Sequence, residues 1–130
     1  MEIKCINNYN NRMDQNIKLK SKQLAAKLII LNKQLSARKK ESVMSTELLK
    51  AGAGIGAGLV RSEYAMGKND RIIKLYNALQ DCAEAKYWLE LLNETDSLTE
   101  FEYTDTYKEL DDVEKLLIII IKSIGAAASK

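Results

Sequence analysis

The chain has 130 residues and contains neither proline nor histidine. Because proline is missing, no ring interrupts a helical hydrogen-bond ladder, and long uninterrupted helices are allowed. Histidine is the commonest general acid or base and the commonest transition-metal ligand. Its absence excludes a Ser-His-Asp triad, a Cys-His pair, a His-based zinc site and a Glu-x-x-His metal bundle. We therefore expect no enzymatic activity, no metal, no cofactor and no small-molecule substrate.

Cysteine and long apolar runs are also scarce. Cys5 and Cys82 form no C-x-x-C pair, so a zinc knuckle and a thioredoxin-like motif are excluded. Cys82 falls on an apolar helical face and is expected to be a small buried side chain rather than a reactive thiol. The longest wholly apolar run, 116–121, is far shorter than the roughly 20 residues of a membrane-spanning helix. The polar N-terminus lacks the apolar core of a secretory signal, so we expect a cytoplasmic protein with no membrane segment.

Apolar residues recur at helical spacing in four stretches, 14–38, 43–65, 70–93 and 99–124. Ser42 or Ser45 is the expected N-cap of the second stretch, and Gly67 is the expected break after it. Thr99 and Glu102 have the spacing of a capping box at the start of the fourth, which is expected to end before Gly125. The pattern predicts an all-α fold, an antiparallel up-and-down four-helix bundle over residues 14–125. A flexible polar N-terminus, 1–13, and a C-terminal tail, 126–130, would flank it.

The predicted core is a stripe on each of three helices. The stripes consist of Ile17, Leu24, Leu28, Leu31 and Leu35 on the first, Ile72, Leu75, Leu79, Cys82 and Leu89 on the third, and Leu110, Val113, Leu117, Ile120, Ile121 and Ile124 on the fourth. Ile118 and Ile119 lie outside the stripe of the fourth helix. A helix that is apolar on more than one side is usually buried on more than one side, so these two isoleucines are candidates for a homo-oligomer interface. A loop or the N-terminal tail of the same chain is the alternative cover.

Charge is unevenly distributed, with about +7 on residues 1–50 and about −5 on residues 51–130. Two basic groups are candidates for contact with the phosphates of RNA or DNA. They are a stripe of Lys18, Lys22, Lys33 and Lys40 along the first helix, and a cluster of Lys68, Arg71 and Lys74. The alternative is a solvated face, or a counter-charge for the acidic fourth helix within the chain or between copies.

Residues 51–58 read Ala-Gly-Ala-Gly-Ile-Gly-Ala-Gly and carry four of the six glycines. Gly52, Gly54 and Ala57 fit a dinucleotide-binding pattern, but no strand precedes them and no phosphate-loop Gly-Lys-Ser/Thr follows. A helical interpretation loses about 3–4 kcal/mol over four glycines relative to alanine, which close packing must offset. The glycines form two i, i+4 stripes, Gly52 with Gly56 and Gly54 with Gly58. The expected partners are Tyr76, Tyr87 and Trp88, and Gly56→Leu is expected to overpack that contact at a cost of about 1–3 kcal/mol.

Several segments together resemble the four-helix bundle proteins of the 23S ribosomal RNA intervening-sequence family. They are residues 48–52, the Ile-Gly-Ala of 55–57, residues 68–92 with the Tyr-Trp-Leu of 87–89, and residues 116–123. The resemblance spans residues 15–124. It departs from the family at Gly58, where asparagine is usual, and near Arg61, where an acid is common. It implies an antiparallel bundle that forms a homo-oligomer, with pentamers known in the family, and no established enzymatic activity. Similarity extends to a more basic nucleic-acid-binding accessory protein of diversity-generating retroelements.

These observations give two hypotheses of function. The first is a non-enzymatic, self-assembling helical bundle that serves as a structural or interaction module, with further copies of itself as the partner. The alternative is an oligomeric RNA- or DNA-binding accessory protein whose basic faces contact phosphates, because assembly multiplies a weak footprint.

Overall fold

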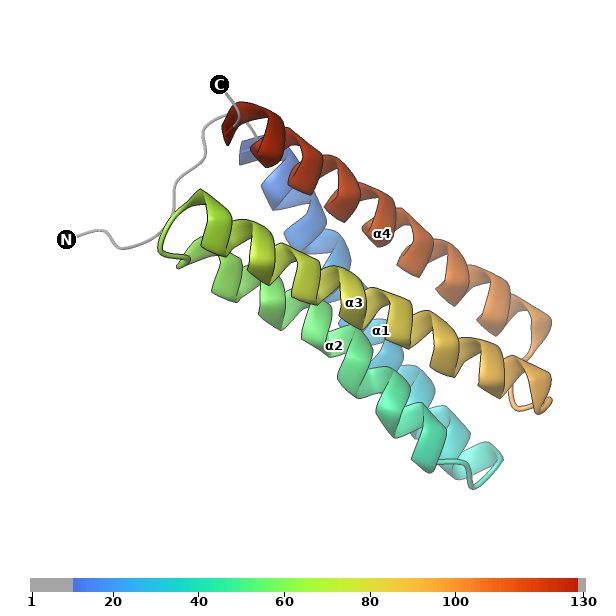
Figure 1. Cartoon of the computed structure of the whole chain (residues 1–130). Helices are drawn as coiled ribbons and strands as arrows, with labels where there is room; N and C mark the ends of the chain where they lie inside the picture. Colours follow the sequence, from blue (N-terminus) through green and yellow to red (C-terminus); the bar gives the residue numbers. More distant parts are fainter. Residues whose placement is uncertain (1–10, 129–130) are drawn as a thin grey trace.

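The computed structural model describes residues 11–128, which form four helices. They are α1 (Asn11–Arg38), α2 (Val43–Glu63), α3 (Lys68–Glu94) and α4 (Glu100–Ala128). Consecutive helices run in opposite directions and lie side by side (Figure 1). The contact between α2 and α3 is the most extensive, and α1 contacts α4 to close the bundle. The predicted all-α fold with four helices in up-and-down order is confirmed.

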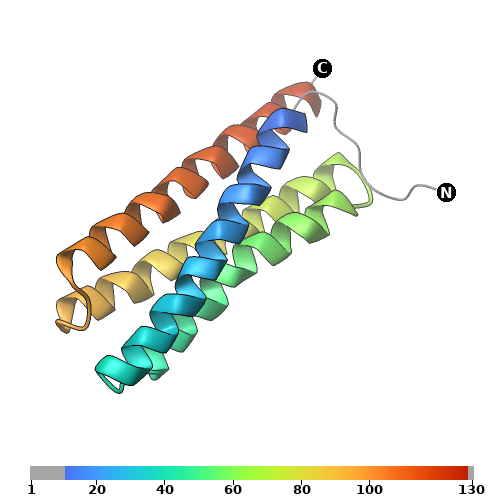
Figure 2. The ribbon, with the colours of Figure 1, turned by 180° about the vertical axis from the view of Figure 1, so that it is seen from behind.

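The view from behind shows α1 crossing the α2–α3 pair at an angle, with its start beside the end of α4 (Figure 2). One face of α1 therefore contacts the bundle, and the opposite face is open along most of its length. Within residues 11–128 no helix combines the length and the apolarity that crossing a lipid bilayer would require.

The core contains the predicted apolar stripes together with Leu48, Ile55 and Leu59 of α2, for which no stripe was predicted. All five stripe residues of α1 and all six of α4 are at most 8% exposed. On α3, Leu75, Cys82 and Leu89 are buried, whereas Ile72 and Leu79 pack at the edge of the core. Their burial supplies the apolar surface that holds the four helices together.

The N-termini of α2 and α4 are capped in different ways. At α4 the Thr99 hydroxyl accepts a bond from the Glu102 amide at 3.1 Å, and the Glu102 carboxylate accepts one from the Thr99 amide at 2.9 Å. The predicted capping box is confirmed. At α2 Ser42 occupies the predicted N-cap position, but its side chain makes no capping hydrogen bond. The Glu41 carboxylate instead accepts the backbone N–H groups of Met44 and Ser45 at 2.9 and 3.0 Å. A carboxylate satisfies two amides and complements the positive end of the helix dipole.

Gly67 and Gly125 do not end the helices that they were predicted to end. Gly67 does not end α2, which already stops at Glu63. Gly67 instead precedes α3 with φ 143°, a conformation that disfavours any side chain. Gly125 does not end the fourth helix, which continues to Ala128. Alanine is the strongest helix former, so the alanines after Gly125 propagate the helix through it.

Parts of the predicted flanking segments, 1–13 and 126–130, belong to the helices. Residues 11–13 already belong to α1, and residues 126–128 belong to α4. Residues 1–10, which include Cys5, and residues 129–130 lie outside the described part of the chain.

Glu102 joins the cap of α4 to the end of α1, because its carboxylate also accepts from Arg38 at 2.8 and 3.1 Å. The bonds from Arg38, helped by those from Thr99, hold the pKa of Glu102 below its ordinary value. A lowered folded-state pKa gives stability that is complete at neutral pH and is lost as pH falls through that pKa.

We therefore expect Glu102→Gln to lower the free energy of unfolding by about 1 kcal/mol at neutral pH. The difference from the parent should shrink as the pH falls through the lowered pKa of Glu102 and vanish once this carboxylate is protonated. Urea denaturation across this pH range measures both effects. Glu100→Gln, in the same helical turn but exposed, is the control. A difference for Glu102→Gln that stays constant with pH would contradict the assignment.

Candidate functional site

The glycine-rich segment lies in the middle of α2, so the helical interpretation of residues 51–58 is confirmed. Two of its glycines are buried at helix–helix contacts. A Cβ placed on Gly52 would lie 2.1 Å from Cδ1 of Leu28 on α1, and one on Gly58 would lie 3.2 Å from the Cβ of Ala78 on α3. The missing side chains let α1 and α3 approach α2 closely, which offsets the poor helix propensity of glycine.

The other two glycines have polar neighbours. A Cβ on Gly54 would lie 2.8 Å from the Asp81 carboxylate, whose pKa is raised by burial and secondarily by the nearby Glu84. A Cβ on Gly56 would meet only Ser21, at an ordinary 3.6 Å. The nearest side chain thus belongs to α1, so the expected contact of Gly56 with aromatic residues of α3 was wrong, and we expect Gly56→Leu to cost less than that contact implied.

The aromatic side chains are not the partners of the glycines within the chain. Tyr76 and Tyr87 are 50% and 55% exposed, and the atoms nearest to the glycines belong to aliphatic and polar side chains. Tyr87 contacts Trp88 edge-on at 5.3 Å between ring centroids. Trp88 packs against the core, and its indole N–H donates to Glu84 at 3.1 Å. The predicted aromatic cover was wrong because Leu28, Asp81, Ser21 and Ala78 are the nearest neighbours of the four glycines.

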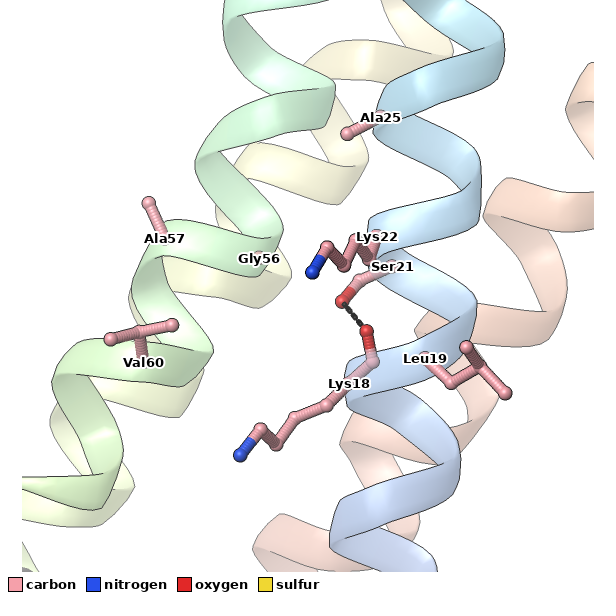
Figure 3. A pocket seen from close by; sticks show the side chains of 8 residues that line it. All are labelled: Lys18, Leu19, Ser21, Lys22, Ala25, Gly56, Ala57 and Val60. Atoms are coloured by element: carbon pink, nitrogen blue, oxygen red, sulfur yellow. Dashed lines mark hydrogen bonds between the residues drawn. The ribbon is translucent and has the colours of Figure 1, made fainter.

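A groove of about 430 Å³ opens between α1 and α2, beside Gly56. Figure 3 shows Lys18 and Lys22 extending from α1 towards α2, with Ala57 and Val60 on the opposite wall. The amine of Lys18 pairs with Glu63 at 2.5 Å, and the Ser21 hydroxyl donates to the Lys18 carbonyl at 3.1 Å. The lining residues are Lys18, Leu19, Ser21, Lys22, Ala25, Gly56, Ala57 and Val60.

Between Lys50 and Arg61 the exposed residues of α2 are apolar, and α1 carries exposed apolar residues among its exposed lysines. No residue from 51 to 60 is charged, although Ala53, Ala57 and Val60 are exposed. On α1, Leu19 and Ile30 are 57% and 56% exposed. We call these five residues the apolar face. A helix without charge on its solvent side is typical of one that another surface covers.

The predicted basic stripe on the first helix is only partly available. Lys22 and Lys33 are exposed on α1, but Lys18 is engaged by Glu63. Lys40 lies beyond the end of α1 with φ 54°, so it does not continue the helical stripe. The stripe therefore reduces to Lys22 and Lys33, with Lys40 at the following turn.

The predicted cluster on the third helix does not form one basic surface. Arg71 is 6% exposed, and its guanidinium pairs with Asp14 of α1 at 2.9 Å. Lys74 pairs with Asp70 at 2.8 Å, which leaves Lys68 exposed at the start of α3. Burial raises the pKa of Asp14, and Arg71 opposes that rise. Arg71 links α3 to α1 and cannot reach a phosphate in the folded chain.

Acids of α4 are countered by basic residues outside the predicted stripe. These pairs join α4 to its two neighbours in the bundle, and Lys86 also lies 4.9 Å from the centre of the Tyr107 ring. The pairs are Lys27 with Asp105 and Glu109, Arg38 with Glu102, and Lys86 with Asp111 and Glu114. The counter-charges of α4 within these pairs thus come from Lys27, Arg38 and Lys86 and not from the stripe for which the alternative was stated.

The two isoleucines predicted at an interface differ in exposure. Ile118 is partly buried, whereas Ile119 is 48% exposed. Ile119 shares the outer side of α4 with the exposed Lys115 and Lys122. Charged side chains therefore lie beside Ile119 on the outer side of α4.

Cys82 is buried, and its thiol donates to the Leu110 carbonyl at 3.3 Å. Burial raises the pKa of this thiol to about 12, so it is protonated at neutral pH and unreactive. Among residues 11–128 no three acidic or cysteine side chains lie together in an arrangement that would hold a metal ion.

The chain is similar to known proteins in sequence and in fold. Residues 13–119 match the family model described as 23S rRNA-intervening sequence protein. The chain also resembles the 1.70 Å crystal structure of a protein of unknown function from the S23 ribosomal protein family of Bacteroides thetaiotaomicron VPI-5482. The two share 39% sequence identity and a TM-score of 0.83, over 85% of this chain and 98% of that one. No curated protein matches the chain. By its sequence and its fold, the chain belongs to the 23S rRNA-intervening sequence protein family.

Proposed function

We propose that the chain is a non-enzymatic, self-assembling helical bundle that serves as a structural or interaction module. One observation carries this proposal: the apolar face of Leu19, Ile30, Ala53, Ala57 and Val60 is open to solvent within one copy. Covering such a surface is favourable by about 25 cal/mol for each Å² removed from water. Without a second copy to cover it, the exposed side of the uncharged stretch 51–60 would stay in contact with water.

Mass measurement by light scattering at micromolar concentration tests self-assembly. The expected mass is a multiple of the 14.7 kDa of one chain. The measured mass should fall towards that of one chain on dilution, because association follows mass action. A mass of 14.7 kDa at all concentrations would overturn the proposal.

The second candidate function is binding of RNA or DNA by the assembled protein. Lys22 and Lys33 favour it, because both are exposed on α1 and no acid occurs from residue 15 to residue 40. Each assembled copy would repeat this basic strip, which raises the apparent affinity for a polyanion.

Nucleic-acid binding predicts that the logarithm of the binding constant falls linearly with the logarithm of salt concentration. Lys22→Gln/Lys33→Gln should reduce that slope by about two, one for each lost phosphate contact. Fluorescence anisotropy with labelled single- and double-stranded RNA and DNA measures the slope. Lys108→Gln/Lys115→Gln on α4 is the matched control. No binding at low salt would remove this candidate.

A further inference from the structure

A second apolar surface lies on the exposed side of α3. Ile73, Tyr76, Ala83 and Tyr87 are all exposed and follow one another at steps of three, seven and four residues. With Gln80 between them, this is the 3–4 spacing by which one helix inserts into a groove between others. We call these residues the α3 ridge. Ile73 and the two tyrosines are each at least 50% exposed, so the ridge has no cover within residues 11–128.

The flanks of the α3 ridge are acidic. Glu84, Glu90 and Glu94 are exposed beside it. The two lysines within the same part of α3 do not balance them, since Lys74 pairs with Asp70 and Lys86 pairs with acids of α4. The exposed side of α3 is therefore apolar along its middle and negative at its margins.

The groove between α1 and α2 has the opposite charge. Lys22 lines its α1 side and is exposed, Lys33 is exposed further along α1, and neither 15–40 nor 51–60 contains an acid. Its floor and α2 wall are formed by Gly56, Ala57 and Val60. Aromatic rings bury most area against a shallow surface, and tyrosine is enriched at the centres of protein interfaces.

From Ile73 to Tyr87 the ridge rises about 21 Å at 1.5 Å per residue. The groove residues of α1, from Lys18 to Ala25, span about 10 Å, so the groove can hold about half of the ridge. Apolar character and opposite charge thus occur on two different faces of one chain. A contact between different faces is heterologous, so each copy can bind one neighbour through its ridge and another through its groove.

We propose that the α3 ridge of one copy docks in the groove between α1 and α2 of a second copy. Tyr76 and Tyr87 then lie against Gly56, Ala57 and Val60 of the neighbour. The inference rests on the proposed self-assembly and names the two surfaces that carry it. Closed rings follow if the rotation between neighbours returns to its start.

Two full-length variants separate the surfaces. Ala57→Arg blocks the groove and leaves the ridge intact, whereas Tyr76→Arg blocks the ridge and leaves the groove intact. Each position is exposed in one copy, so circular dichroism should show parental helix content. Each variant alone should associate at least about 30-fold more weakly than the parent, the loss typical of a central interface residue.

A mixture of the two variants in equal amounts gives the decisive result. One working ridge and one working groove remain, so the mixture should form dimers of twice 14.7 kDa and nothing larger. Phe101→Arg, at a position 73% exposed on α4, should keep the parental mass. Should either variant lose helix content, Val60→Arg and Tyr87→Arg carry the same test.

The outcomes distinguish this inference from the proposed function. A monomeric parent overturns both. An oligomeric parent whose Ala57→Arg or Tyr76→Arg variant keeps the parental mass leaves self-assembly standing and overturns the ridge-in-groove contact. A mixture that stays monomeric also overturns the contact, because two blocked variants must complement each other in a heterologous interface.

Discussion

Gly58→Leu is expected to lower the free energy of unfolding by about 2 kcal/mol. A Cβ on Gly58 would lie 3.2 Å from the Cβ of Ala78, with the Ala78 backbone at 3.6 and 3.8 Å. Backbone atoms cannot move aside as a side chain can, so α2 and α3 must separate. Overpacking costs up to about 3 kcal/mol, and the better helix propensity of leucine returns a little under 1 kcal/mol.

The same substitution at Gly56 is the matched control. The only neighbour of a Cβ there is Ser21 at 3.6 Å, and the groove between α1 and α2 leaves room for the side chain. At a protein concentration at which the parent is monomeric, the free energy of unfolding of Gly56→Leu should therefore lie within about 1 kcal/mol of that of the parent. Urea denaturation of both variants measures the contrast. Equal destabilisation at the two positions would contradict the assignment of Gly58, and not Gly56, to the α2–α3 contact.

The second large effect is expected at Leu28, whose side chain occupies the space above Gly52. Leu28→Ala should cost about 3 kcal/mol, because Leu28 is 1% exposed and its removal leaves a cavity. Gly52→Ala in the parent should cost about 1 kcal/mol, since its Cβ would overlap Cδ1 of Leu28 and force that side chain to move. Leucine and glycine at these positions are thus matched in volume.

The sign of the Gly52→Ala effect should reverse in the Leu28→Ala background. There the added methyl group enters the cavity, and alanine improves helix propensity, so the double variant should be about 1 kcal/mol more stable than Leu28→Ala alone. A double-mutant cycle from urea denaturation gives the coupling, expected at about 2 kcal/mol. Additive effects would show that Leu28 and Gly52 do not share the space that the structure gives them.

The fold could be predicted from the sequence because its determinants are local. Periodicity within one helix identifies a buried stripe without knowledge of the partner, as it did for Leu24 and Leu28. The capping box of Thr99 and Glu102 involves residues only three apart. The helix ends were less predictable where a longer side chain competed, as Glu41 did with Ser42.

The side-chain partners could not be predicted because they depend on tertiary contacts. Arg71 reads as an exposed base, yet its partner Asp14 is 57 residues away in sequence. Lys18 is engaged by Glu63 in the same way. The glycines show the reverse case: their packing role was correctly inferred, but their neighbours were taken to be aromatic rather than Leu28 and Ala78. The i, i+4 spacing of glycines shows that a helix has a surface without side chains, but it does not show which residues pack against that surface.

Tyr76 and Tyr87 do not contact the glycines within one copy, but in the proposed assembly they contact the glycine-rich helix of a neighbouring copy. Tyr76 and Tyr87 are exposed on α3, and within residues 11–128 nothing covers the exposed side of the glycine-rich helix. A contact between copies brings these two surfaces together without altering the fold of either.

The most direct measurement compares the light-scattering mass of the parent with that of Gly56→Leu, both at the same micromolar concentration. The leucine should fill the groove while leaving stability nearly unchanged, so the account predicts a parent at a multiple of 14.7 kDa and a folded variant at 14.7 kDa. A folded variant with the mass of an oligomeric parent would contradict the account.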